Sequence, residues 1–411
     1  MTDRLYYNDS FLYDFDAEVR EVQDSPRPSL ILDRTAFYPT SGGQIHDSGH
    51  ITVANSDHKF RVTEVADTED GHVVHYLEAP LDVSAGTRIH GQIDAARRRD
   101  HMQQHSAQHV LSAAFIELFD MPTVSFHMAD DYCSIDLDLS DLNTPTLTQS
   151  QVESAERRAN EIILENRPVS IRYVAREEAA GLGLRKPPTE GRDQLRLIDI
   201  QNFDLSACGG THVNSTGQVA GLLCRKFEKV RQGWRVEFVA GQRAVSVARR
   251  DFQTLSETAA LFSAHIYDTP TQARKSLDEI RSLRKQHEQI SSELATAQAG
   301  RLLAETPENS GRRLILHTFP DRDLNFLKLL AQRLTRQVSN AIVLLAAESP
   351  QPVLIFAQSP GQPNDMAALL KQAVASHGGR GGGSKDLAQG GVPNSTSLAA
   401  ALSSAAQSLR A

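Results

Sequence analysis

Cysteine is scarce in this chain of 411 residues, which contains only Cys133, Cys208 and Cys224. So few cysteines exclude a disulfide framework and are typical of a reducing compartment. No apolar run approaches the roughly 20 residues that a transmembrane helix needs. The N-terminal segment also lacks the basic and apolar regions of a signal peptide. We therefore expect a cytoplasmic protein without a membrane partner.

An excess of positive charge is missing too, because 51 acidic residues outnumber 43 basic ones and the net charge is −8. Such a chain is not a general nucleic-acid coat, so any RNA contact must use local basic patches. The length exceeds what one ordinary hydrophobic core supports and predicts two or three domains.

Two pairs of possible metal ligands are the most informative feature that is present. His105 and His109 are four residues apart in HSAQHV, and Cys208 and His212 have the same spacing in CGGTHV. Segment 97–119 has the pattern of an amphipathic helix, on which side chains four apart share one face. The glycines of CGGTH favour a tight turn instead. Since a thiolate and three imidazoles suit a tetrahedral Zn²⁺ ion, we expect one zinc ion per chain, bound by His105, His109, Cys208 and His212.

Each pair alone is a weak signal. Histidines four apart occur on helices that bind no metal, and a lone cysteine is most often a small buried hydrophobic residue. His101 extends the helix pattern to three histidines. Because His101 and His109 are about 12 Å apart along a helix axis, they cannot share an ion. The spacing does not choose between the pairs 101/105 and 105/109.

The remaining pattern predicts an α+β fold in four parts. Residues 1–95 show short alternating strands between turn residues, which predicts a small β-barrel. Residues 96–245 combine helices and strands around the metal ligands and predict a zinc-bearing α+β domain. Residues 246–310 predict a helical, coiled-coil-like linker. Residues 311–411 alternate buried strands with helices and predict a small α/β domain.

The last two parts carry little chemistry of their own. Apolar residues in the linker form an imperfect heptad seam, which we expect to pack against segment 245–265 and to contribute to a homodimer together with the C-terminal domain. The glycine-rich segment 378–391 lacks the GxxxxGK[ST] pattern, which excludes a nucleoside triphosphate site there.

Three motifs together carry a family resemblance. With FYPTSGGQIHDSG at 37–49, HSAQHVLSAAF and CGGTHV, the chain resembles the editing domain of alanyl-tRNA synthetases. It resembles more closely the long form of the free-standing alanyl-tRNA editing proteins, the AlaX family. The family pattern of HxxxH followed by CxxxH selects His105 and His109 and leaves His101 outside. Ile45 departs from the proline usual in the family. Residues 311–411 are similar to the C-terminal domain of alanyl-tRNA synthetases, so the resemblance covers nearly the whole chain but includes no aminoacylating core.

The resemblance implies an ATP-independent aminoacyl-tRNA deacylase that serves translation fidelity. Its substrate would be tRNA(Ala) mischarged chiefly with serine, with glycine as the second candidate. The family's roles beside the ester fall here on Thr35, which pairs with the serine hydroxyl, on Gln44 of the GGQ loop, and on His127 of SFHM. Four ligands describe a closed zinc site, so a catalytic ion and a template ion both stay open.

Basic residues predict the RNA contacts. Over 221–244 they are interleaved with Phe227 and Trp234, a mixture that suits phosphate and base contacts, although a solvated hairpin face is the alternative. By resemblance, the C-terminal domain binds the outer corner of tRNA. The residues expected to contact RNA are Arg225, Lys226, Lys229, Arg231, Arg235, Arg380 and Lys385.

Other functions fit parts of this pattern. A tRNA-binding factor with a purely structural zinc site would also fill all four ligand positions. A zinc hydrolase of another small ester, or of another mischarged tRNA, would share the motifs.

Overall fold

The computed structural model describes residues 1–54, 56, 58–140, 146–179, 181–185, 194–231 and 233–410. Within these residues the chain divides into two units, Met1–Glu257 and Thr258–Ala411, each of which is described by itself. No described helix is long and apolar enough to span a membrane. The turn through Gln232 lies outside the described residues.

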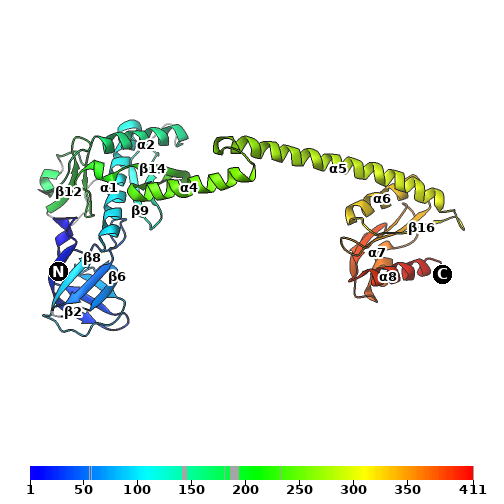
Figure 1. Cartoon of the computed structure of the whole chain (residues 1–411), viewed down its shortest axis with the longest axis horizontal. Helices are drawn as coiled ribbons and strands as arrows, with labels where there is room; N and C mark the ends of the chain where they lie inside the picture. The colour runs from blue at the N-terminus through cyan, green and yellow to red at the C-terminus, as the bar shows by residue number, and fades with distance from the viewer. Residues whose placement is uncertain are drawn as a thin grey trace. The chain divides into compact units, whose positions relative to one another are not determined.

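A closed β-barrel begins the first unit, in the strand order β2-β3-β7-β6-β5-β8 (Figure 1). Alternation explains it: along β2 (Asp14–Gln23) the side chains of Phe15, Ala17 and Val19 point inward and their neighbours point to solvent. The predicted barrel is therefore confirmed. Its other strands are β3 (Ser29–Leu32), β5 (Gly49–Val53), β6 (Lys59–Asp67), β7 (Val73–Leu77) and β8 (Arg88–Ile93), and a short parallel pair is formed by β1 (Asp3–Arg4) and β4 (Arg34–Thr35).

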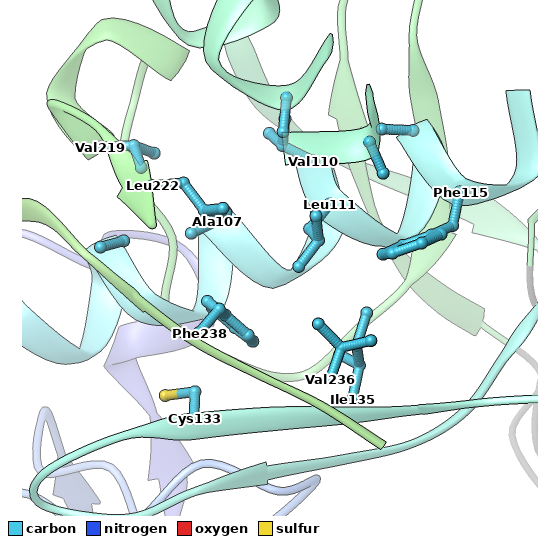
Figure 2. Packing of buried hydrophobic residues seen from close by; sticks show 14 of the residues in the cluster. Ala107, Val110, Leu111, Phe115, Cys133, Ile135, Val219, Leu222, Val236 and Phe238 are labelled. Carbon is cyan, nitrogen blue, oxygen red and sulfur yellow. The ribbon is translucent and has the colours of Figure 1, made fainter. Parts of the chain in front are cut away.

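Helix α1 (Ala95–Phe119) is the centre of the rest of this unit. It begins at the N-cap Asp94, whose side chain accepts hydrogen bonds from Ala96 N and Arg97 N, and it ends at Asp120 in the left-handed region. Figure 2 shows Leu111 and Phe115 of this helix packed toward the sheet that contains Val236. That sheet has the order β14-β15-β10-β9, with β9 (Thr123–Met128), β10 (Cys133–Leu137), β14 (Leu222–Val230) and β15 (Gly233–Ala240).

A second sheet and a second helix complete the unit. The sheet has the order β11-β12-β13, with β11 (Val169–Ala175), β12 (Gln194–Ile200) and β13 (Asp204–Ala207). Strand β13 leads directly into CGGTHV, so the sheet fixes where that turn begins. Helix α2 (Gln149–Leu164) starts with a capping box at Thr148 and packs on α1. The short elements are α3 (Arg176–Ala179) and the 3-10 helices η1 (Leu5–Tyr7) and η2 (Thr216–Val219), and α4 (Gly241–Leu261) follows β15.

The second unit contains a five-stranded sheet, in the order β16-β17-β18-β20-β19, with helices on it. The predicted glycine-rich segment forms a hairpin of this sheet, β19 (Arg380–Gly383) and β20 (Leu387–Gly391). Its glycines have a packing cause, because a Cβ at Gly381 or Gly390 would press on Leu370 of α7 (Met366–Ala375). The other elements are η3 (Ile266–Asp268), α5 (Thr269–Glu305), β16 (Arg313–Phe319), α6 (Leu324–Gln337), β17 (Ala341–Ala347), β18 (Val353–Gln358) and α8 (Ser395–Ser408).

The predicted heptad seam lies on the long helix α5. Ile280, Leu283 and Ile290 of this seam are exposed by 46%, 55% and 64%. The predicted helical pairing, the homodimer and the four-part domain division stay predictions.

Candidate metal centre

The two predicted ligand pairs meet in space. One ligand atom from each of His105, His109, Cys208 and His212 lies within 4.8 Å of the others, and three of the four residues are buried. Helix α1 presents His105 and His109 on one face, and the turn after β13 brings back Cys208 and His212.

The spacing of these atoms fits a zinc ion. Tetrahedral zinc with thiolate and imidazole ligands places neighbouring ligand atoms roughly 3.3–3.6 Å apart. Sγ of Cys208 lies 3.4 Å from Nε2 of His105 and 3.4 Å from Nε2 of His212. A set of one sulfur and three nitrogens also suits zinc chemically, since thiolate and imidazole are its usual protein ligands.

A second layer of side chains holds each imidazole by its other nitrogen. Nδ1 of His105 lies 2.8 Å from Oε1 of Gln44, and Nδ1 of His212 lies 3.1 Å from Oγ of Ser106. Nδ1 of His109 lies 3.0 Å from Oδ2 of Asp204. With Nδ1 of each ring engaged, Nε2 is left for the metal, which is the arrangement typical of zinc-binding histidines.

Gln44 connects the barrel loop to the ligand turn. Its side chain is completely buried, and its Nε2 donates to Oγ1 of Thr211 at 2.8 Å. Its Oε1 also accepts from the backbone N of Thr211 at 3.2 Å. Gly210 lies at the same contact, where a Cβ would collide with the imidazole of His105. The GGQ loop and the CGGTHV turn therefore fix each other and the ring of His105.

A buried ion pair anchors the GGQ loop to α1. Arg98 and Asp47 are both completely buried, and Nε of Arg98 donates to both carboxylate oxygens of Asp47. Arg98 also donates to the carbonyl oxygen of Ser10, while Tyr38 N donates to Oδ2 of Asp47 at 2.6 Å. Gly43 has φ +84°, and its Cβ would overlap Phe126 of β9, so this loop needs glycine there.

At Cys208, His212 and Asp204 the electrostatics favour the protonation states that a metal needs. Burial alone would raise the pKa of the Cys208 thiol, but the imidazoles of His105 and His212 lower it well below its usual range. Burial, followed by the neighbouring His105, lowers the pKa of His212 well below its usual value. Burial would raise the pKa of Asp204, yet its hydrogen bond with His109 and the charge of Arg185 lower it to about 2. A thiolate, a neutral imidazole and an ionised carboxylate result.

A cavity of ≈370 Å³ opens beside the cluster. Its walls include His105, His109 and Cys208, and the ring of Phe126 stacks on His105 with centroids 5.2 Å apart. Most of its other side chains are polar. The polar residues that line the cavity besides the ligands are Tyr38, Ser41, Gln108, Thr123, Ser125, Arg185 and Ser206.

Three predicted site residues lie away from this cavity. Thr35 is completely buried in the barrel, where its hydroxyl lies 2.8 Å from Nε2 of His75. His127 is exposed on β9 and pairs with Ser134 in the register of the sheet. His101 is buried beside Asp47, and its Nδ1 has no hydrogen-bond partner among the described residues. The cluster that could hold a metal includes His105 and His109 and not His101, which removes the ambiguity of the three helix histidines.

The basic residues of the β14–β15 hairpin differ in whether they form an ion pair. Arg225 pairs with Asp251, Lys226 with Glu228, and Arg235 with Asp136. Lys229 and Arg231 are exposed and form no ion pair with a described residue. In the second unit, Arg380 begins β19 and Lys385 lies in the turn between β19 and β20, and both are exposed.

Sequence reasoning missed the side chains that support the ligands. Asp204, Ser106 and Thr211 each lie close in sequence to a predicted ligand, and the rule that zinc-binding histidines donate to an acceptor would have directed attention to them. Arg185 gave no such signal. It joins the site only because its Nε donates to Oδ1 of Asp204 at 2.6 Å.

Comparisons with known sequences agree with the motifs. Residues 2–97 match the family described as tRNA synthetases class II (A), residues 195–235 the threonyl and alanyl tRNA synthetase second additional domain, and residues 315–411 the DHHA1 domain. The alanyl-tRNA editing protein AlaX-L of Pyrococcus horikoshii is 30% identical over 396 residues, which are 95% of this chain and 95% of that protein.

Alanine–tRNA ligases are similar over the same length of this chain. The ligase of Archaeoglobus fulgidus is 31% identical over 95% of the chain, and that of Thermococcus kodakarensis is 30% identical over 96%. The chain spans 42% of the length of each ligase. The C-Ala domain of Aquifex aeolicus alanyl-tRNA synthetase is 23% identical, over 23% of this chain and 90% of that one, with a TM-score of 0.22.

Proposed function

The chain belongs to the family of the alanyl-tRNA editing protein AlaX-L, and from this premise we propose that it hydrolyses the ester of wrongly charged tRNA(Ala). The proposed substrates are chiefly seryl-tRNA(Ala) and, second, glycyl-tRNA(Ala). The observation that carries the proposal is the polar cavity whose wall includes His105, His109 and Cys208.

The four clustered residues would hold one Zn²⁺ ion, through Sγ of Cys208 and the Nε2 atoms of His105, His109 and His212. Bound there, the ion would supply a Lewis acid or a fixed template for the substrate. Because four protein ligands complete a tetrahedron, we assign the positioning of the ester and of the attacking water to the cavity walls. Aminoacyl esters are labile, so positioning and stabilisation of the developing negative charge are sufficient tasks for those walls.

Gln44 acts in this proposal through His105 rather than on the substrate. Its amide is buried and occupied by His105 and Thr211. It is therefore a positioning residue, which fixes one ligand ring and the ligand turn. For His127, an exposed side chain outside the cavity wall, the proposed role is a contact with the tRNA.

Selectivity requires a polar group that the serine hydroxyl satisfies. An apolar wall separates serine from alanine weakly, whereas a buried polar group left unpaired by alanine separates them strongly. The family resemblance gives this role to Thr35, which lies in the barrel and pairs with His75. Thr123 offers a hydroxyl in the cavity itself. We expect Thr35→Val to lose the preference for serine and to keep ester cleavage. If Thr123→Val lost the preference for serine and Thr35→Val kept it, Thr123 would be the residue that recognises the serine hydroxyl.

Deacylation of purified aminoacyl-tRNAs tests the function. The zinc content of the protein is first confirmed at one ion per chain, and seryl-tRNA(Ala), glycyl-tRNA(Ala) and alanyl-tRNA(Ala) are then compared. Rapid loss of serine with alanine spared is the expected result. No cleavage of any ester by folded, zinc-loaded protein would instead support a tRNA-binding factor with a structural zinc, which the four filled ligand positions favour. Cleavage confined to other tRNAs would make the chain an editor of a different mischarged species.

A further inference from the structure

The β14–β15 hairpin carries its charges on two unlike faces. Its register pairs Lys226 with Glu237 and Glu228 with Arg235, so these side chains share one face of the sheet. On that face Nζ of Lys226 lies 2.7 Å from Glu228, and Nε of Arg235 lies 2.7 Å from Asp136 of β10. The cations of this face are therefore already neutralised by neighbouring carboxylates.

The opposite face ends in cations that form no ion pair within the part of the chain that the structure describes. Lys229 stands opposite Trp234 in the register, which places the two Cβ atoms about 5 Å apart. The rings of Trp234 and Phe227, with centroids 5.9 Å apart, are only partly covered by the core. Lys229 and the adjoining Arg231 are exposed and pair with no carboxylate of a described residue.

Lys229, Arg231 and Trp234 border a groove of ≈500 Å³ together with Val124 and Asp138. Val124, which is 48% exposed, also borders the cavity beside the metal cluster. Asp138 accepts a hydrogen bond from Ser140 N at 2.8 Å, so its carboxylate is engaged with its own backbone. The groove thus carries two cations that form no ion pair with a described residue, one carboxylate and an indole, and it adjoins the cavity at one residue.

We propose that this groove binds the single-stranded 3′ end of the tRNA and leads its terminal nucleotide into the cavity. Trp234 stacks on a base, and Lys229 and Arg231 contact phosphates. Proteins bind single-stranded nucleic acid through this combination of an aromatic platform and a positive groove. The inference rests on the proposed function, because it takes the end of a tRNA as the ligand of the cavity.

Binding of uncharged RNA tests the groove without any hydrolysis. The full-length zinc protein is titrated with an acceptor-stem minihelix of tRNA(Ala), once with and once without its unpaired 3′ nucleotides. The double variant Lys229→Ala/Arg231→Ala is expected to bind the intact minihelix about tenfold more weakly. The fall of log K with log salt should also become shallower, its slope decreasing in magnitude by about 1.4. Trp234→Leu is expected to bind the intact minihelix about tenfold more weakly, whereas Trp234→Phe should keep most of the wild-type affinity.

The truncated minihelix makes the test specific. If the groove binds the 3′ end, removing that end abolishes the effect of both variants, and Lys59→Ala, at an exposed lysine of barrel strand β6 outside the groove, changes neither titration. Equal losses with both RNAs, or no loss with either, would overturn the inference. If the variants weaken binding only when the 3′ end is present but the protein cleaves no ester, the deacylase proposal alone is contradicted. If the protein cleaves the ester but the variants bind both minihelices alike, the groove proposal alone is contradicted. Zinc content confirms that each variant is folded.

Discussion

Nδ1 of His109 lies 3.0 Å from Oδ2 of Asp204, a carboxylate that is also bound by Arg185 and Ser206. This hydrogen bond ties the helix that carries one ligand pair to the strand that leads into the other. Gln44 makes the corresponding connection from the barrel loop to His105. The geometry of the four candidate metal ligands therefore depends on parts of the chain that are far apart in sequence.

Asp204→Asn tests this dependence. The asparagine keeps an acceptor for His109 but loses the charge that raises the basicity of the ring and holds Arg185. We expect zinc affinity to fall about 10- to 100-fold, measured by competition with a chromogenic chelator. Asp199→Asn is the matched control, because Asp199 lies on the neighbouring strand β12 and pairs with Arg172 of β11. Unchanged affinity in Asp204→Asn would mean that this carboxylate only supports the fold.

Two adjacent glycines in the ligand turn make a second pair of variants. A Cβ at Gly210 would collide with the imidazole of His105, whereas a Cβ at Gly209 would lie 3.6 Å from the ring of Tyr7, an ordinary contact. Gly210→Ala is therefore expected to lose bound zinc and Gly209→Ala to retain one ion per chain. Metal analysis of the purified proteins decides. Full zinc occupancy in Gly210→Ala would show that the turn can move away from His105 at little cost.

The sequence predicted the ligands because their chemistry is local. The i, i+4 spacing of His105 and His109 needs only a helix, and the glycines of CGGTHV need only a turn. The alternating strands of the barrel could be predicted for the same reason, since each strand buries one face. Which of His101 and His109 joins His105 in the ligand cluster was not local, because it depends on where β13 ends.

The supporting contacts were harder to predict from sequence. Gln44 is buried against Thr211, a contact across 167 positions that no periodicity reveals. Likewise, the ion pairs that neutralise Arg225 and Arg235 join residues from separate elements. The basic pattern of the hairpin was visible, but only the register separated its neutralised face from Lys229.

A buried histidine predicts how this unit responds to acid. Burial lowers the pKa of His75 to about 4, and the hydrogen bond with the backbone of Leu30 offsets only part of this shift. Because the unfolded chain has the higher pKa, it binds more protons between pH 6.5 and 4, and stability falls as the pH falls through that range. From pH 7.5 to 5 this group should cost about 2 kcal/mol.

His75→Gln removes that titration and keeps a partner for Thr35. Urea unfolding, followed by fluorescence of Trp234, the single tryptophan, is compared at pH 7.5 and pH 5. Since the variant shares every other titrating group, the wild type should lose about 2 kcal/mol more than the variant. Equal losses in the two proteins would place the acid sensitivity elsewhere.

The buried pair of Arg98 and Asp47 supports the last prediction, which concerns how the barrel is joined to the metal centre. Removing one partner leaves an uncompensated charge in a completely buried site, so Arg98→Met should destabilise the unit by about 3–5 kcal/mol. The double variant Arg98→Met/Asp47→Leu should recover part of this loss, because no charge is left unpaired. It should not recover all of it, since the carbonyl oxygen of Ser10 and the backbone N of Tyr38 lose their partners as well. Urea unfolding by Trp234 fluorescence measures the coupling, and additive losses would show that the two charges do not interact across the loop.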